Sequence, residues 1–345
     1  MSSKIFDGPR YHQYNEKILL RSKLNSTIRN FFHSNQFLEV ETALVQVSPG
    51  LDRYTQPVSV NLKEVFNKSI LYRYLHTSPE FAMKKILARS KTNIFQICKA
   101  FRDSEDSVIH HPEFSILEWY SLESDYKYLI SQVKELIGKC SDALEVKNFK
   151  YRDFIFPINK TWLEISLSDL FIKFVGINIF DTIDNPLNPS PHKIIKFAEK
   201  IGVFCHQGDK WEDVFHKIMI QIIEPKIAEF GLVIVYDYPV CLGSSAKIVN
   251  KDICERAEVY IAGIEIANGC SELLGSEDNL SIFRHNQQFN YSLNQELIPI
   301  DMDLVKDLDS LADCAGMALG IDRLLMVLTG AKNIKDIIYS PVNLE

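Results

Sequence analysis

The stretch ICKAFRDSEDSVIHHPEFSILEWY, residues 97–120, places a charged loop between two runs of residues that suit β-strands. The runs predict strands at 94–101 and 114–122, which are antiparallel if the loop between them closes a hairpin. The loop carries an arginine, several acidic residues and two adjacent histidines. A solvated surface turn and a site that binds a polyanion both fit this pattern, and the stretch alone leaves both open.

Three residues of this stretch suit a binding site. Arg102 follows the first strand and points into the loop, where its guanidinium could hold a phosphate through two parallel hydrogen bonds. Glu118 and Tyr120 are two residues apart on the second strand, so both side chains face the same side of the sheet. Taken singly, each of these residues more often has a structural role or is a solvated charge.

The composition is that of an ordinary globular protein. The chain has 345 residues, 46% of them apolar and 24% charged, with a net charge of −7. That charge argues against a broad basic face for nucleic acid, and no apolar run is long enough to span a membrane. The first residues lack an apolar signal core, and the seven cysteines form no CxxC pair. We therefore expect a cytoplasmic protein with reduced thiols and no structural zinc site.

Hydrophobic periodicity predicts helices and strands that are grouped along the chain. Helices are expected at about 14–35, from Ser78-Pro79-Glu80 onward, at 126–137, over most of 160–228 and at 321–328. Further strands are expected at 37–42, 69–75, 232–239, 257–269 and 316–320. Strands at both ends around a helical middle favour an α+β fold with an antiparallel sheet over a Rossmann fold. Neither a G-x-G-x-x-G sequence nor a P-loop occurs.

Two further stretches combine ionisable side chains with small residues. In GIEIANGCSELLG, residues 263–275, Glu265 and Glu272 could hold a divalent cation between them, with phosphate as a further ligand. An ordinary strand residue and a capping residue fit that stretch about as well. In GMALGIDRLLMVL, residues 316–328, a ligand could approach the small residues closely, and Arg323 could cover a phosphate. An unremarkable strand, turn and helix would have the same pattern.

Together, three stretches resemble the signature motifs of class II aminoacyl-tRNA synthetases. FFHSNQFLEVETALV (31–45) is similar to motif 1, AFRDSEDSVIHHPEFSILEWY (100–120) to motif 2 and GMALGIDRLLM (316–326) to motif 3. TSPEFAMKKIL (77–87) and GIEIANGCSEL (263–273) are similar to the lysyl-type subgroup. The motifs occur in family order over about residues 15–330, and the ordered set is far more specific than any one motif. The resemblance implies a class II catalytic core, an antiparallel sheet flanked by helices.

Within the lysyl type, the chain is most similar to truncated paralogues that attach (R)-β-lysine to elongation factor P. Motif 1 begins near the first residue, without room for an anticodon-binding domain, and Ala318 stands where lysyl-tRNA synthetases usually have glycine. The resemblance implies one catalytic domain over 1–345, with a mostly helical insertion at about 160–228. It further implies an AMP-forming ligase that activates a diamino acid and transfers it to elongation factor P. A homodimer through the motif 1 region is expected, and tRNA is not an expected partner.

The resemblance also implies a role for each matching residue, with ATP and Mg²⁺ taking part in the reaction. Arg102 and Arg323 match the catalytic arginines, which contact the α- and γ-phosphates respectively. The expected ATP-binding residues are Arg102, Asp103, Ser104, His111, Glu265, Ile266, Gly320 and Arg323, and the expected metal ligands are Glu265 and Glu272. The expected residues of the amino-acid pocket are Ser78, Pro79, Glu80, Glu118, Tyr120 and Glu272.

The sequence departs from the family pattern at positions expected to contact adenine and at one position of the expected dimer interface. Motif 2 usually begins Arg-Asn-Glu, and here the arginine is followed by Asp103 and Ser104. His111 replaces the family's asparagine, an arginine usual in that loop is absent, and Ala43 replaces the proline that ends motif 1. The phosphate and carboxylate positions are retained, which favours an active enzyme. The alternatives are a lysyl-type fragment that charges tRNA, a paralogue that amidates an amino acid, and a non-catalytic synthetase-like regulator.

Overall fold

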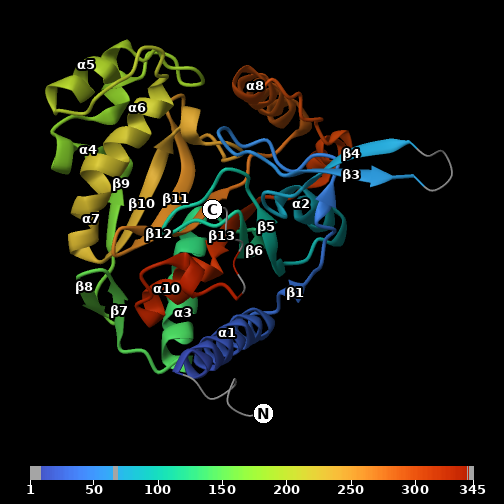
Figure 1. Ribbon diagram of the computed structural model, residues 1–345. Coiled ribbons are helices and arrows are strands. Elements are labelled where there is room, and N and C mark those ends of the chain that lie inside the picture. Colours follow the sequence, from blue (N-terminus) through green and yellow to red (C-terminus); the bar gives the residue numbers. More distant parts are fainter. Residues whose placement is uncertain (1–8, 65–68, 340, 342–345) are drawn as a thin grey trace.

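The structure is a computed structural model that describes residues 9–64, 69–339 and 341. The predicted domain covers residues 1–345, and its ends, residues 1–8 and 342–345, lie outside the described part of the chain. In the described part, the largest sheet has eight strands in the order β1-β5-β6-β13-β12-β11-β10-β9 (Figure 1). Their bounds are β1 Leu38–Glu39, β5 Ile94–Phe101, β6 Glu113–Leu122, β9 Leu163–Ser166, β10 Leu232–Pro239, β11 Ile253–Ile261, β12 Ile264–Ser271 and β13 Cys314–Gly320.

Neighbouring strands of this sheet are antiparallel except at its two edges, where β1 is parallel to β5 and β9 to β10. Two smaller sheets contain β2 Val45–Gln46, β3 Ser59–Lys63 and β4 Ile70–Leu75, and β7 Asn148–Tyr151 with β8 Phe154–Pro157. The α-helices are α1 Pro9–Ser34, α2 Glu80–Ser90, α3 Tyr126–Ala143, α4 Leu167–Val175, α5 His192–Lys200, α6 Trp211–Ile218, α7 Glu224–Phe230, α8 Ser276–Asn294, α9 Met302–Asp307 and α10 Ile321–Thr329. None of the described helices is long and apolar enough to cross a membrane.

The alternation of side chains along each strand gives the large sheet two different faces. On β6, Leu117 and Trp119 are fully buried in the main hydrophobic cluster, whereas Glu118 and Tyr120 face a cavity on the other side. Helices α1, α3 and α10 cover the apolar face (Figure 1). The predicted common orientation of Glu118 and Tyr120 is therefore confirmed.

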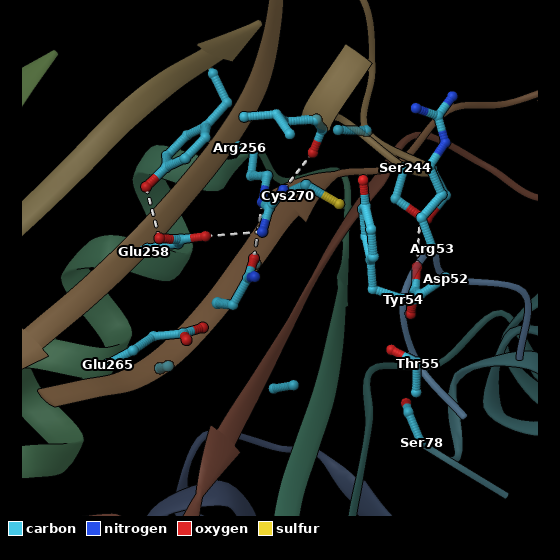
Figure 2. A pocket seen from close by; sticks show the side chains of 18 of the residues that line it. Asp52, Arg53, Tyr54, Thr55, Ser78, Ser244, Arg256, Glu258, Glu265 and Cys270 are labelled. Carbon is cyan, nitrogen blue, oxygen red and sulfur yellow. Dashed lines mark hydrogen bonds and ion pairs between the residues drawn. The ribbon is translucent and has the colours of Figure 1, made fainter. Parts of the chain in front are cut away.

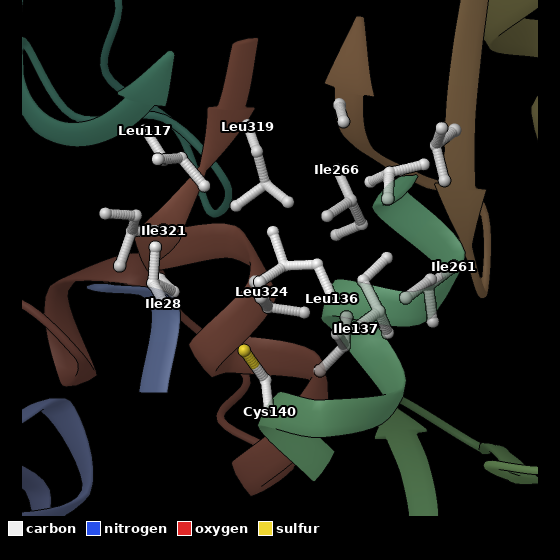
Figure 3. Packing of buried hydrophobic residues seen from close by; sticks show 14 of the residues in the cluster. Ile28, Leu117, Leu136, Ile137, Cys140, Ile261, Ile266, Leu319, Ile321 and Leu324 are labelled. Atoms are coloured by element: carbon white, nitrogen blue, oxygen red, sulfur yellow. The ribbon is translucent and has the colours of Figure 1, made fainter. Parts of the chain in front are cut away.

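The core on the apolar face explains why the three helices pack where they do. Each presents a stripe of branched aliphatic side chains toward inward-facing residues of the strands. Figure 3 shows part of this contact, with Ile28, Leu136, Ile137 and Leu324 of the helices and Leu117, Ile261, Ile266 and Leu319 of the sheet.

The opposite face is covered at both ends and left open in the middle. Helices α4 to α7 pack on β10 and β11 around Trp211 and Phe215, which are buried. At the other end α2 and α9 pack on β5 and β13 around Met83 and Leu304. Figure 1 shows these two groups of helices on either side of the central strands. The uncovered centre of this face carries the candidate site.

Several predicted elements have different bounds in the structure. The strand predicted at 37–42 pairs with β5 only through Leu38 and Glu39, after which the chain leaves the sheet. The stretch predicted as strand at 257–269 is a hairpin, because Ala262 and Gly263 both have the positive φ that a type I′ turn requires. Pro79 is the N-cap residue of α2 and not its first helical residue, although Ser78 Oγ accepts a hydrogen bond from the Glu80 amide, 3.1 Å away.

A buried carboxylate joins three elements that are far apart in the sequence. Asp322, in the first turn of α10, is 2% exposed and forms an ion pair with Arg21 of α1. Its other oxygen accepts a hydrogen bond from the Ser115 amide of β6, 2.6 Å away. This contact fixes the motif 3 helix against the motif 2 strand and thereby the position of the neighbouring Arg323.

Replacing this carboxylate should lower stability. In Asp322→Ala, the Arg21 guanidinium and the Ser115 amide lose their partner, so we expect a loss of about 2–3 kcal/mol in urea unfolding. Asp303→Ala is the control, because Asp303 and Lys306 form an exposed pair and its removal should change stability by about 0.5 kcal/mol or less. Equal effects of the two substitutions would contradict the structural role of Asp322.

Candidate active site

One cavity of about 640 Å³ on the open face brings most of the predicted residues together. The predicted residues that line it are Ser78, Glu80, Arg102, His111, Glu118, Tyr120, Glu265, Ile266, Glu272, Gly320 and Arg323. Pro79, Asp103 and Ser104 are not among its lining residues. Asp103 and Ser104 are exposed in the β5–β6 loop, so an ATP contact from them stays a prediction.

Arg102 holds its guanidinium at the entrance to this cavity. Its Nε donates to the carbonyl oxygen of Thr77, 3.4 Å away, and its guanidinium carbon lies 5.2 Å from the ring centroid of Phe114. The Glu105 carboxylate is 3.8 Å away, too far for a strong ion pair. The Arg102 side chain is 32% exposed, so its remaining donors face open space where an anion can bind.

Arg323 is fixed more firmly, on the same side of the cavity. It donates to the main-chain oxygens of Glu265 and Ile109, at 2.9 and 3.3 Å, and to Nε2 of His110, at 2.7 Å. Burial and the Arg323 charge both lower the pKa of His110, so its ring is neutral and Nε2 can accept. His110 had no role predicted from sequence, and it holds Arg323 in place. The neighbouring His111 is buried, and its Nδ1 lies 2.6 Å from the Glu113 carbonyl oxygen.

A β-bulge in β12 brings Glu265 and Glu272 to the same face. Glu265 pairs with Tyr260 and Ala267 with Val259, so Ile266 is an extra residue without a partner on β11. Residues seven apart in a regular strand face opposite sides, and the extra residue reverses this. Both carboxylates therefore line the cavity.

The same strand keeps the two carboxylates apart, which corrects the predicted metal site. Seven residues at about 3.3 Å each separate them by about 23 Å along the strand, so they do not bind one ion between them. Glu272 instead forms an ion pair with Lys84, at 2.6 Å. A metal role for Glu265 stays a prediction, and Glu272 belongs to the other end of the cavity.

Sequence reasoning missed a charged group on β11 beside Glu265. Glu258 accepts hydrogen bonds from the hydroxyls of Tyr238 and Tyr260, at 2.6 and 2.5 Å, and from Arg256, at 2.7 Å. Figure 2 shows Arg256 reaching Glu258, with Glu265 on the neighbouring strand. The signal was present in the sequence, because positions 256, 258 and 260 alternate along a strand and must share one face.

Glu258 and Glu265 lie close enough at this end of the cavity for their charges to interact. Burial, and after it the Glu258 charge, raises the pKa of Glu265, while Arg323 opposes the rise. A divalent cation bound here would relieve that repulsion and would suit oxygen ligands. Within residues 9–64 and 69–339 no group of three or more His, Cys, Asp or Glu side chains is placed to hold a metal ion. Phosphate oxygens would therefore have to complete its coordination.

The other end of the cavity is acidic and deeply buried. Glu118 is 3% exposed and accepts hydrogen bonds from Tyr120 Oη, at 2.7 Å, and Ser78 Oγ, at 2.6 Å. Burial, and after it the Glu80 charge, raises the pKa of Glu118 to about 7, although both hydrogen bonds oppose the rise. Glu118 and Glu80 therefore face the same small space and repel each other.

Lys84, another residue without a predicted role, joins two carboxylates at this end. Its ammonium lies 2.6 Å from both Glu80 and Glu272, and Ser245 Oγ lies 3.3 Å from it. Burial raises the pKa of Glu272 to about 7 against the opposing effect of Lys84. A side chain at Gly316 would meet the Tyr120 ring and Glu272, because a Cβ there would lie 2.3 Å from the ring and 2.8 Å from the carboxylate. Glycine is thus required where the pocket floor is tightest.

The comparison with known families agrees with the motifs and the fold. The family model of class II tRNA synthetases, for the D, K and N types, matches residues 1–344. The chain belongs to the class II tRNA synthetase family. This confirms the predicted α+β fold with a largely antiparallel sheet flanked by helices.

Curated relatives match nearly the whole chain. An elongation factor P–(R)-β-lysine ligase of Haemophilus ducreyi is 30% identical over 93% of this chain and 92% of its own length. A ligase of the same name from Mannheimia succiniciproducens is 28% identical over 94% and 95%, and a homologue from Aquifex aeolicus is 31% identical over 89% and 93%. The predicted resemblance to this group is confirmed. The chain is an ATP-dependent ligase of the class II synthetase kind.

The raised pKa of Glu118 predicts a pH-dependent contribution to stability. Its pKa rises from 4.5 to about 7 on folding, so the contribution is complete below about pH 4.5 and is lost as the pH rises through about 7. Glu118→Gln cannot ionise. As the pH rises from about 4.5 to above 7, the free energy of unfolding of Glu118→Gln should therefore increase by on the order of 3 kcal/mol relative to that of the unsubstituted protein, measured by urea unfolding. A stability difference that does not change with pH would contradict the raised pKa.

Proposed function

We propose that the chain activates (R)-β-lysine with ATP as an acyl-adenylate and transfers it to a lysine side chain of elongation factor P. The observation that carries this proposal is the division of one cavity into an end that holds two arginines and a buried end lined by carboxylates. Arg102 and Arg323 lie at one end, and Glu80, Glu118 and Glu272 lie at the other. The names of the relatives support the same substrate and acceptor.

The acidic end suits a molecule with two ammonium groups. Burying an ammonium ion is costly unless a carboxylate accompanies it, and this end offers three carboxylates within a small buried space. The hydroxyls of Tyr120 and Ser78 fix the Glu118 carboxylate, so it is already oriented before a ligand arrives. The resemblance assigns Ser78, Pro79, Glu80, Glu118, Tyr120 and Glu272 to this pocket.

The other end suits the triphosphate of ATP. In our proposal, Arg102 contacts the α-phosphate and Arg323 the γ-phosphate, since both guanidiniums are held by main-chain oxygens and keep donors toward the cavity. Ile266 and Gly320 would lie against the nucleotide, and His111 beside adenine. Glu265, together with Glu258, would hold Mg²⁺, which supplies charge neutralisation at the phosphates when it is bound.

The chemistry follows from bringing the two ends together. The substrate carboxylate oxygen attacks the α-phosphorus in line, an O–P bond forms, and the bond to pyrophosphate breaks. The neutral lysine amine of elongation factor P then attacks the acyl carbon. A C–N bond forms, the C–O bond to AMP breaks, and the amine loses one proton. Arg102 stabilises the negative charge that develops on the α-phosphate in the first step.

The remaining features of the proposal concern the whole assembly. The chain would act as a single catalytic domain, with the helices between β9 and β10 as an insertion. A homodimer would form through the motif 1 region, where α1 and β1 lie, in the cytoplasm. The exposed Leu19, Leu38 and Leu44 in this region are compatible with such an interface.

The decisive experiment supplies the protein with ATP, Mg²⁺, (R)-β-lysine and unmodified elongation factor P. Mass spectrometry should find the mass of one β-lysyl residue added to a lysine of the acceptor. A parallel reaction with tRNA in place of the acceptor should give no charging. Charging of tRNA without modification of elongation factor P would overturn the proposal.

Arg102→Ala tests the first step separately. Because Arg102 acts mainly on charge that develops in the transition state, pyrophosphate exchange dependent on the diamino acid should fall by about 100-fold or more. The control is Arg152→Ala, an exposed arginine in the turn between β7 and β8, which should leave exchange unchanged. Exchange by Arg102→Ala at the rate of the control would refute the role given to Arg102.

A further inference from the structure

We propose that Lys84 is an internal counter-ion that sets the charge of the acidic pocket and thereby its preference for a diamino acid. This inference rests on the proposed function and extends it to a residue that would not touch the substrate. Lys84 is 3% exposed and does not line the cavity, whereas its partners Glu80 and Glu272 do. Lys84 is therefore a positioning residue.

The geometry leaves Lys84 no freedom to take another role. Its ammonium donates hydrogen bonds to Glu80 Oε1, at 2.6 Å, and to Ser245 Oγ, at 3.3 Å, and forms an ion pair with Glu272 Oε2, at 2.6 Å. Ser245 also donates to Glu80, at 3.1 Å. The next residue, Lys85, points elsewhere and pairs with Asp301, at 2.6 Å.

The formal charges of the pocket match a substrate with two ammonium groups. When ionised, Glu80, Glu118 and Glu272 carry three negative charges, and Lys84 reduces the total to two. Asp52, which also faces this space, is left out of the count because the charges of Arg102 and Arg256 act on it. A substrate with two ammonium groups neutralises that remainder, whereas a substrate with one leaves a buried charge uncompensated. The number of charges, more than any single contact, would then select a diamino acid.

Lys84 also favours the ionised forms of two neighbouring carboxylates against the effect of burial. Because one nitrogen contacts both, their nearest oxygens lie at most about 5 Å apart. Without the ammonium, carboxylates this close share a proton, and one of them becomes neutral near pH 7. The pocket would then have one negative charge fewer for binding an ammonium group, and that carboxylate would ionise only at a higher pH.

Other titratable groups face the same space and enter the expected pH response. These groups are Glu80 of α2, Glu118 and Tyr120 of β6, Cys270 of β12, Glu272 just after β12, Cys314 of β13 and Asp52 in the loop after Gly50. Burial raises the pKa of the tyrosine and both thiols, so these groups stay neutral near pH 7. The response therefore belongs to the carboxylates.

The test compares pyrophosphate exchange by Lys84→Met and the unsubstituted protein over a range of pH with (R)-β-lysine. We expect KM for the diamino acid to rise about tenfold or more, with KM for ATP within about twofold. The acidic limb of the pH profile of kcat/KM for the diamino acid should move upward by about one unit. Lys85→Met is the matched control and should leave both quantities unchanged.

A double variant separates charge balance from loss of structure. Lys84→Met with Glu272→Gln removes both members of the ion pair, so Glu80 no longer has Glu272 to share a proton with, and the acidic limb should return toward its original pH. An unmoved limb in Lys84→Met, or one that Glu272→Gln does not restore, would overturn the inference. Absence of exchange with (R)-β-lysine in the unsubstituted protein would instead count against the proposed function.

Discussion

The two-residue repeat of the large sheet is the constraint on which the rest of the structure depends. Because α1, α3 and α10 bury one face, every second residue of the central strands must be apolar, as Leu117 and Trp119 are. The intervening positions are then free to carry charge on the other face, where Glu118 lies. The apolar contact shown in Figure 3 therefore fixes the direction of the side chains that form the site.

The bulge in β12 is a local exception that this constraint makes necessary. A regular strand would point Glu272 into the helix-covered face if Glu265 pointed into the cavity. The extra Ile266 keeps apolar residues on the covered face and both carboxylates on the open one. This departure from regular pairing thus orients both carboxylates toward the cavity, and it leaves only Ile266 without a partner on β11.

The fold and the site differ in how far the sequence could predict them. Strands 94–101 and 232–239 were predicted with their observed bounds, because their hydrophobic runs are bounded by charge and turn residues. The predicted metal ion shared by Glu265 and Glu272 fails on distance, because seven residues of extended strand hold the two carboxylates too far apart. The bulge that turns both toward the cavity leaves no mark in a run such as IEIANG, where strand and bulge have the same composition. Lys84 was missed because a lysine on a helix is usually solvated, and one of its two carboxylate partners, Glu272, lies nearly two hundred residues away.

The carboxylates at one end of the cavity and the arginines at the other have a consequence for how a substrate would be oriented. An amino acid carries its own negative charge, and the three carboxylates at the closed end repel it. The same groups attract ammonium ions, so in the proposed function a diamino acid would enter with its amines toward Glu118 and its carboxylate toward Arg102. That carboxylate is the group that must approach the α-phosphorus. The acidic pocket would therefore contribute to catalysis by orientation, without taking part in bond making itself.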